Sequence, residues 1–230
     1  DIIASRYTES NTELVDINHM RKNRQTLKFT KMQGTSDDYI FINNLAGEIT
    51  CPESLCVTFC DRHYGVGADG IVLMERSHKA DAKMIMYNAD GSRGAMAGNA
   101  LRCMAKYLYD NNIVRKDAMT IETDTGVKTV EVYTTNGKVT SATVDMGYAT
   151  LDTTALHLNL PEKEIVGYPV TIGEKEYAIT CVDMGNPHCV VFCDDPSALD
   201  LETLGPKFER ASYFPERINT EFVRIVNEDT

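Results

Sequence analysis

The sequence predicts an α+β protein in which a β-sheet curls around one buried helix. Short runs with the alternation typical of β-strands recur from Leu27 onward. Between them lies a helical pattern at residues 99–110, where apolar residues recur at i, i+3, i+4 and i+7. The apolar residues of this pattern are Ala100, Leu101, Cys103, Met104, Ala105, Tyr107 and Leu108. Because they cover most of the circumference of the helix, we expect a sheet that surrounds it.

The elements before this helix follow from β-formers, from Gly and from Pro. We expect strands at residues 27–32, 39–43, 71–74 and 83–87, and a helix at 52–61 that Pro52 begins. Residues 1–26 are polar and aperiodic, which predicts an N-terminal extension outside the fold.

After the helix the pattern is that of strands. We expect them at 120–123, 127–133, 139–146, 170–172, 177–184, 189–193 and 221–226, with a helical turn near 199–208. Asn136-Gly137 predicts a hairpin turn. The first domain is expected at 27–141 and the second at 142–230. Because residues 227–230 are a turn signal without a return strand, we expect the second domain to be truncated at its C-terminal side.

Composition and charge exclude several classes of protein. The 230 residues hold 23 Lys and Arg against 34 Asp and Glu, for a net charge of −11. This balance argues against a nucleic-acid partner and against an anionic membrane surface. No apolar run approaches the ~18–20 residues of a membrane span, and no signal peptide is evident at the start. We therefore predict a cytoplasmic protein.

The seven cysteines have mostly apolar neighbours, which predicts buried, reduced thiols rather than a disulfide framework. Cys51, Cys56, Cys60 and His63 lack the CxxC spacing of structural zinc sites, so no metal is expected. Residues 65–70 match the GxGxxG dinucleotide fingerprint. However, a helical segment precedes them and a strand follows, the reverse of the order that nucleotide binding requires. We expect the glycines to form a tight turn instead.

Two runs could carry chemistry. In residues 88–103 a Gly-rich loop leads into the predicted helix with Asn99 as its expected N-cap, so that free N–H groups there could receive a carboxylate. An ordinary capped helix would show the same residues. In residues 185–191, His188 follows Asn-Pro at the mouth of a strand, where it could orient a ligand, transfer a proton or be only structural. Asn219 precedes another strand and could face the same site.

Together these motifs resemble diaminopimelate epimerase. They are Met32-Gln33-Gly34, Asp61–Gly70, Asn88–Cys103, Gly185–Val191, Leu204-Gly205-Pro206 and Phe214–Asn219, and they occur in the order found in the family. The resemblance implies two similar domains, each a β-sheet wrapped around a central helix. It also implies inversion of one stereocentre of LL-diaminopimelate to give the meso isomer, without pyridoxal phosphate, metal or nucleotide, in a homodimer.

The resemblance also implies the site residues. The family transfers the α-proton with two cysteines on opposite faces of the substrate. Ala97 stands at the position of the first cysteine, and the second is expected beyond residue 230, so we expect this chain to be inactive. The implied substrate-binding residues are Asp37, Asn88, Gly98, Asn99, Asn186 and Asn219, with His188 in support. Asp37 replaces an Asn of the family, and its carboxylate should weaken the binding of a substrate carboxylate.

Two other functions are compatible with these residues. Another cofactor-independent amino-acid racemase of the same fold would share the motifs, because a fold does not fix the substrate. A non-catalytic homologue that binds an amino acid or a partner chain would share them as well. The presence or absence of Cys at position 97 in the native gene would separate an epimerase from the last of these.

Overall fold

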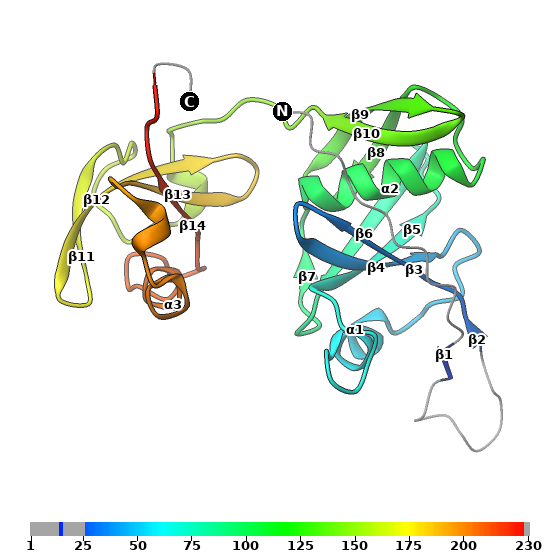
Figure 1. Ribbon diagram of the computed structural model, residues 1–230, viewed down its shortest axis with the longest axis horizontal. Helices are drawn as coiled ribbons and strands as arrows, with labels where there is room; N and C mark the ends of the chain where they lie inside the picture. The colour runs from blue at the N-terminus through cyan, green and yellow to red at the C-terminus, as the bar shows by residue number, and fades with distance from the viewer. Residues whose placement is uncertain (1–13, 16–25, 228–230) are drawn as a thin grey trace. The chain divides into compact units, whose positions relative to one another are not determined.

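The computed structural model describes residues 14–15 and 26–227. The chain divides into two compact units, Asp1–Asp145 (unit 1) and Met146–Thr230 (unit 2). Each unit combines a β-sheet with helices (Figure 1). The α+β fold predicted from the sequence is therefore confirmed.

Unit 1 is built on an eight-stranded sheet with the order β10-β9-β8-β6-β5-β4-β3, in which β7 also pairs with β6. The strands are β3 (Thr30–Gly34), β4 (Asp37–Asn43), β5 (Gly70–Glu75), β6 (Ala82–Asn88), β7 (Arg93–Gly94), β8 (Ala118–Thr123), β9 (Gly126–Thr135) and β10 (Lys138–Val144). Most neighbours are antiparallel, but β4 runs parallel to β5 and β6 runs parallel to β8.

The sheet curls around helix α2 (Gly98–Asp110). This helix contacts β3 and β4 and also β9 and β10, which lie at opposite ends of the strand order. Leu101, Met104 and Leu108 are fully buried, as the apolar periodicity predicts. A buried ion pair anchors the C-terminal half of the helix, because Lys106 Nζ lies 2.8 Å from the Asp110 carboxylate and Asp110 accepts the Val139 N–H of β10.

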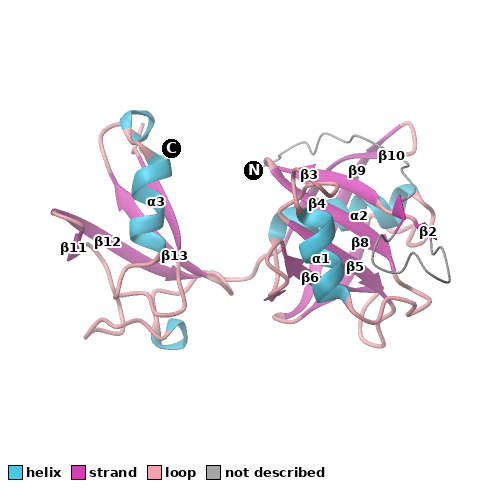
Figure 2. Cartoon of the chain, turned by 90° about the horizontal axis from the view of Figure 1, so that it is seen from below, coloured by secondary structure: helices cyan, strands magenta, loops and turns pink. Residues whose placement is uncertain are grey.

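Helix α1 (Pro52–Cys60) covers the other face of this sheet (Figure 2). Pro52 stands in its first turn, where a missing N–H costs nothing. The helix buries Cys56, Phe59 and Cys60 against a cluster that includes Ile40 and Ile71. The central strands β4 and β5 are therefore buried on both faces, which explains their nearly continuous apolar sequences.

The turn between β9 and β10 has the conformation that its sequence predicts. Asn136 has φ 53° and Gly137 has φ 76°. A type I′ hairpin turn requires positive φ at both central residues, and Asn-Gly is the pair that adopts it most readily.

Unit 2 holds a four-stranded sheet with the order β11-β12-β13-β14. Its elements are η2 (Thr154–Leu156), β11 (Tyr168–Ile172), β12 (Lys175–Asp183), β13 (Pro187–Phe192), η3 (Pro196–Ala198), α3 (Leu201–Glu209) and β14 (Asn219–Val223). Strand β14 runs parallel to β13. Phe208 of α3 is fully buried between the rings of Tyr177 and Phe222, at 4.9 and 5.2 Å.

Three sequence predictions need correction or remain open. Leu14–Val15 (β1) and Thr26–Leu27 (β2) form an antiparallel pair, so part of the predicted extension has structure; the rest of residues 1–26 lies outside the described residues. The strand predicted at 221–226 spans 219–223 instead, because its pairing with β13 ends at Phe192. The domain limits at 141 and 142 stay a prediction, and position 141 lies inside β10.

Two features are absent from the described residues. None of their helices is long and apolar enough to cross a membrane. Within 14–15 and 26–227, no three His, Cys, Asp or Glu side chains gather in a way that could hold a metal ion.

Candidate active site

The first candidate site lies at the N-terminus of α2. Ala97 is the N-cap residue, with φ −136° and ψ 122°, and no side chain of residues 14–15 or 26–227 caps the helix. The prediction that Asn99 is the N-cap is therefore wrong: the helix begins at Gly98, and Asn99 is its second residue. The first backbone N–H groups of α2 have no capping side chain, which leaves donors and the positive end of the helix dipole for an anion.

The side chain of Asn99 is engaged by tertiary contacts. Its Nδ2 donates to Asp37 Oδ2 at 2.7 Å, and its Oδ1 accepts from Arg102 of the next turn. Arg102 also donates to Thr35 Oγ1 at 3.0 Å. These four residues, Thr35, Asp37, Asn99 and Arg102, form what we call the Asn99 cluster. It joins the β3–β4 turn to the start of α2.

A close approach of the backbone brings this turn to the helix. A Cβ atom added at Gly34 would lie 3.1 Å from the Asn99 carbonyl oxygen and 3.4 Å from Cys103 Sγ, so glycine lets β3 lie directly on α2. The turn itself is strained, because Thr35 (φ 54°) and Ser36 (φ 74°) are left-handed without being glycine. Such strain persists where surrounding contacts hold the chain in place.

An ionic network fixes the strand that follows Asp37. Asp38 accepts from both terminal nitrogens of Arg62, at 2.8 and 3.2 Å, and pairs with Lys31 at 2.9 Å. Arg62 also reaches Asp69 at 2.8 Å. Burial acts to raise the pKa of Asp38, but the hydrogen bonds from Arg62 and Lys31 outweigh it and hold that pKa well below its usual range. The ionised carboxylate of Asp38, paired with Arg62 and Lys31, thus holds the start of β4 in place.

The part of the chain that the structure describes places no thiolate in the Asn99 cluster. Ala97 offers only a methyl group. Cys103 is fully buried on the inner side of α2, and burial raises its pKa to about 11, so its thiol is protonated at neutral pH. The first candidate site can therefore bind through hydrogen bonds and charge. It holds no thiolate among the described residues, and its carboxylate, Asp37, already accepts the Asn99 amide.

Asn88 ends β6, at the start of the loop that leads to α2. Its Nδ2 donates to Ser92 Oγ at 3.0 Å, and its backbone N–H donates to the Ser92 carbonyl at 2.9 Å. The loop then returns along β6 through the short strand β7. Asn88 thus closes its own turn, and Gly98 is the first residue of α2.

The second group of predicted residues lies in unit 2. His188 Nε2 lies 2.9 Å from Asn186 Oδ1, and His188 Nδ1 lies 2.7 Å from Glu221 Oε1. Asn219 is paired with His188 across the parallel strands β13 and β14. We call Asn186, His188, Asn219 and Glu221 the His188 cluster. The structure thus brings together the three unit 2 residues that the sequence predicts.

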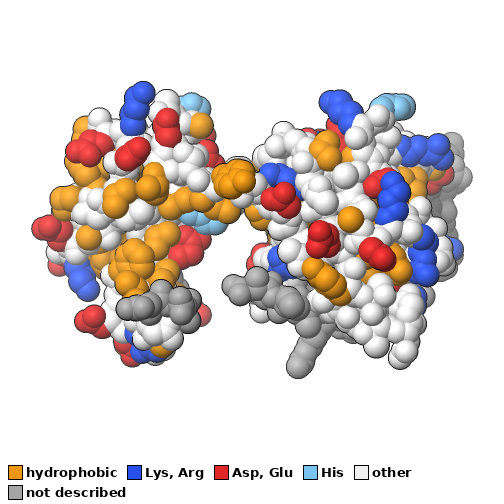
Figure 3. Space-filling view, turned by 90° about the horizontal axis from the view of Figure 1, so that it is seen from above, with side chains coloured by type: hydrophobic (Ala, Val, Ile, Leu, Met, Phe, Trp, Pro, Cys, Tyr) orange, Lys and Arg blue, Asp and Glu red, His pale blue; other side chains and the backbone are white. Residues whose placement is uncertain are grey.

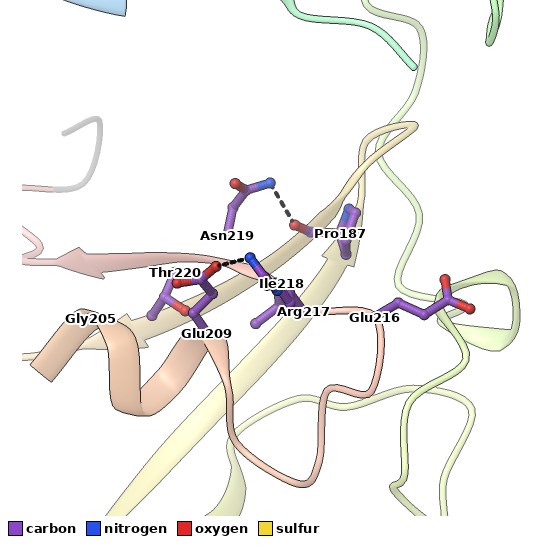
Figure 4. Close-up of a pocket in the computed structure, with 8 residues that line it drawn as sticks. All are labelled: Pro187, Gly205, Glu209, Glu216, Arg217, Ile218, Asn219 and Thr220. Carbon is purple, nitrogen blue, oxygen red and sulfur yellow. Dashed lines mark hydrogen bonds and ion pairs between the residues drawn. The ribbon is translucent and has the colours of Figure 1, made fainter. Parts of the chain in front are cut away.

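Asn219 also lines a surface cavity of about 420 Å³ beside α3 (Figure 4). Its Nδ2 donates to the Pro187 carbonyl at 3.0 Å, which holds the Asn-Pro-His segment to the start of β14. Arg217 lines the same cavity and pairs with Glu209 of α3 at 3.1 Å. The cavity therefore has an amide, a guanidinium and a carboxylate in its wall.

The GxGxxG segment forms backbone hydrogen bonds with the end of α1. The N–H groups of Gly65, Val66 and Gly67 donate to the carbonyls of Asp61 and Phe59 at the end of α1, at 2.8–3.0 Å. These amides are not available to a pyrophosphate. A Cβ at Gly70 would lie 2.3 Å from the Tyr87 carbonyl oxygen, so this glycine permits the close pairing of β5 with β6.

Sequence reasoning missed three residues of these clusters, Thr35, Arg102 and Glu221, and the sequence held a signal for the last two. Arg102 stands three positions after Asn99 on the same helix, a spacing that places the two side chains together. Glu221 stands two positions after Asn219, so strand alternation puts both side chains on one face. These spacings were a usable signal for each residue, but the partners His188 and Thr35 are set by tertiary contacts.

Comparison with solved structures identifies the fold. A hydroxyproline epimerase from Agrobacterium vitis, solved with bound trans-4-hydroxy-L-proline, matches with a TM-score of 0.55 at 14% identity, over 78% of this chain and 52% of that one. A probable proline racemase from Agrobacterium radiobacter K84 matches with a TM-score of 0.56 at 16% identity, over 81% and 55%. The chain spans about half of these structures, and the likeness shows a fold shared with epimerases and racemases.

Sequence comparison is more specific. A family model described as diaminopimelate epimerase matches residues 29–151 and 180–230. The diaminopimelate epimerase of Desulfovibrio desulfuricans is 44% identical over 207 residues, covering 87% of this chain and 72% of the relative. That of Agathobacter rectalis is 40% identical over 210 residues, covering 88% and 74%. The chain belongs to the diaminopimelate epimerase family, a family of isomerases, and the resemblance found in its motifs is confirmed.

Proposed function

We propose that this protein binds diaminopimelate as an epimerase of LL- and meso-diaminopimelate does, and that Ala97 leaves it without the acid–base group on one face of the substrate. The observation that carries the proposal is the start of α2. There, uncapped N–H groups and Asn99 surround a position whose side chain is a methyl group. The α-proton of an amino acid is barely acidic, so its transfer needs a placed base as well as stabilisation of the carbanion.

Isotope exchange tests the missing base. The chain as it stands is expected to incorporate no deuterium at the α-carbon of LL-diaminopimelate in heavy water, measured by NMR. Binding measured by calorimetry on the same sample is expected to be retained. Incorporation well above a protein-free control would contradict the inactivity, and absent binding would contradict the substrate.

Ala97→Cys tests the placement directly. A thiol introduced at the helix N-terminus should have a lowered pKa and react rapidly with iodoacetamide, and bound diaminopimelate should cover it. Cys51 is a matched control within the chain, because it is an exposed thiol at the N-cap of α1. Mass spectrometry of the labelled peptides should show protection of the introduced thiol alone. Equal labelling with and without diaminopimelate would argue against a site at this helix.

We expect the Asp37 carboxylate to make the affinity for diaminopimelate lower than the family resemblance alone implies. Its carboxylate takes the Asn99 amide at 2.7 Å and adds negative charge beside the candidate anion site. Asp37→Asn is therefore expected to tighten diaminopimelate binding several-fold in calorimetry. A loss of affinity would instead indicate that Asp37 receives a substrate ammonium group, which favours another amino-acid substrate of the same fold.

We also infer, from the family resemblance, a cytoplasmic homodimer. The cysteines support a reducing compartment through their sequence surroundings, since most have apolar neighbours typical of buried thiols. Light scattering after size-exclusion chromatography tests the dimer. A measured mass equal to one chain would contradict it. Localisation of the tagged protein in fractionated cells tests the compartment.

A further inference from the structure

Glu221 is the member of the His188 cluster that the proposed function does not use. Strand alternation places it on the same face of β14 as Asn219, and its Oε1 lies 2.7 Å from His188 Nδ1. Its other oxygen, Oε2, is buried without a hydrogen-bond partner among the described residues. One oxygen of this carboxylate is buried and the other contacts a histidine, so the carboxylate is held in a defined orientation.

The chemistry of the donors and acceptors then fixes a chain of three side chains. A carboxylate only accepts hydrogen bonds, so His188 Nδ1 carries a proton. The second ring nitrogen, Nε2, lies 2.9 Å from Asn186 Oδ1, so His188 links the Glu221 carboxylate to the Asn186 amide. With its Oδ1 taken by His188, Asn186 has its Nδ2 left to donate, and no described residue receives it.

We propose that Glu221 is a positioning residue for substrate binding, which acts through His188 to hold the Asn186 amide with its Nδ2 ready for a ligand carboxylate. The identity of the ligand rests on the proposed function. The orientation of the amide does not. Without the Glu221 carboxylate, His188 Nδ1 loses its fixed acceptor, so either ring nitrogen can donate and the Asn186 amide can turn its oxygen toward the ligand.

A second histidine pair in unit 2 shows what an ordinary surface contact looks like. His157 Nδ1 lies 3.2 Å from Glu216 Oε1, and both side chains are 68% exposed. His188 is 26% exposed, its contact is shorter, and it has Asn186 on its second nitrogen. The His157–Glu216 pair is therefore a matched control, in which a carboxylate faces a histidine without a third side chain.

A double-mutant cycle on binding tests the proposal. Glu221→Gln is expected to weaken diaminopimelate binding about tenfold, the loss of one hydrogen bond to a charged group. In an Asn186→Ala background the same change is expected to cost nothing further, because Glu221 acts through that amide. An equal loss in both backgrounds, or no loss in either, would overturn the proposal. If Glu221→Gln does not fold, His188→Leu takes its place in the cycle with the same expected coupling.

NMR without ligand separates the positioning from the proposed function. Glu221→Gln is expected to change the ring-nitrogen signals of His188 together with the side-chain amide signals of Asn186. Glu216→Gln should change the signals of His157 alone. If the parent chain fails to bind diaminopimelate, the proposed function fails, and these spectra still decide the role of Glu221. Unchanged Asn186 signals in Glu221→Gln would overturn it.

Discussion

The two units support their candidate sites in different ways. In unit 1 the sheet has α1 on one face and α2 within its curve, so the Asn99 cluster rests on the end of a fully buried helix. In unit 2 the helix α3 packs against the sheet, and the His188 cluster stands on strand ends. Backbone N–H groups dominate the first site, whereas the second depends on side chains that orient one another.

The surfaces reflect this difference. Most of the large hydrophobic side chains that are well exposed belong to the smaller unit 2: Tyr148, Leu151, Val166, Phe192, Leu201, Ile225 and Val226. The space-filling view shows such side chains gathered over much of the unit 2 face that it presents (Figure 3). Unit 2 therefore buries less of its apolar surface within the described residues, and its stability should depend on fewer contacts.

The largest expected effect comes from Phe208→Ala. This ring lies at the centre of the unit 2 core, so its loss should lower the free energy of unfolding of unit 2 by about 3–5 kcal/mol. Hydrogen exchange under increasing denaturant, resolved by peptide, measures each unit. Leu201→Ala, which removes a half-exposed side chain from the same helix, is the control and should cost less than about 1 kcal/mol. Equal destabilisation of unit 1 would break the comparison, because the units would then unfold together.

Lys106→Met tests the anchor of α2 in unit 1. The Lys106 and Asp110 side chains are only 9% and 11% exposed, so removing one charge strands the other and should lower the free energy of unfolding by about 3 kcal/mol. Lys116→Met is the matched control, since its pair with Asp81 is 60% exposed at the lysine and should contribute under about 1 kcal/mol. Similar losses for the two variants in chemical denaturation would show that burial of the pair is unimportant.

The pH dependence of unit 1 should contain a contribution from Asp38. Because the pKa of its carboxyl is lower in the folded state than in the unfolded chain, ionised Asp38 stabilises the fold above about pH 5. That contribution is lost as the pH falls from about 4 toward the folded-state pKa. Asp38→Asn should therefore lower the stability at pH 7 by about 1–2 kcal/mol, discounted for the exposed Arg62, and flatten the acid limb.

Chemical denaturation of the parent and of Asp38→Asn at a series of pH values from 2 to 7 measures both expected changes. Glu48→Gln, an equal change of charge at an exposed position, should leave the limb in place. An acid limb in Asp38→Asn as steep as in the parent would assign it to other carboxylates. Such a result would show that the Asp38 ion pairs do not determine the acid stability of unit 1.

The smallest expected effect is a gain. Ser36 has φ 74° in the β3–β4 turn, where glycine carries no steric penalty. Ser36→Gly should therefore raise the free energy of unfolding of unit 1 by about 0.5–1 kcal/mol. Ser36→Ala keeps the strain and is the control. A gain from alanine as large as that from glycine would mean that loss of the hydroxyl group, rather than relief of the backbone, stabilises the turn.

Local patterns in the sequence predicted the elements that local physics controls. The apolar stripe of residues 99–110 located α2 to within a residue, since helical periodicity depends on neighbours three and four positions away. Asn136-Gly137 located the β9–β10 turn for a similar reason. The prediction failed at Asn99, because the partner that draws its side chain away from capping, Asp37, lies 62 residues earlier in the chain.

The sequence by itself located the buried helix to within a residue, because its apolar stripe depends on short-range periodicity. It placed the N-cap at Asn99, whereas the structure places it at Ala97. The tertiary structure alone decided that Asp37 and Arg102 share the Asn99 amide, and that Glu221 reaches His188. The reason is physical: each hydrogen bond needs two groups within about 3 Å. Only the pairing of β3 with β4 on α2, and of β14 with β13 beyond α3, brings such distant residues together.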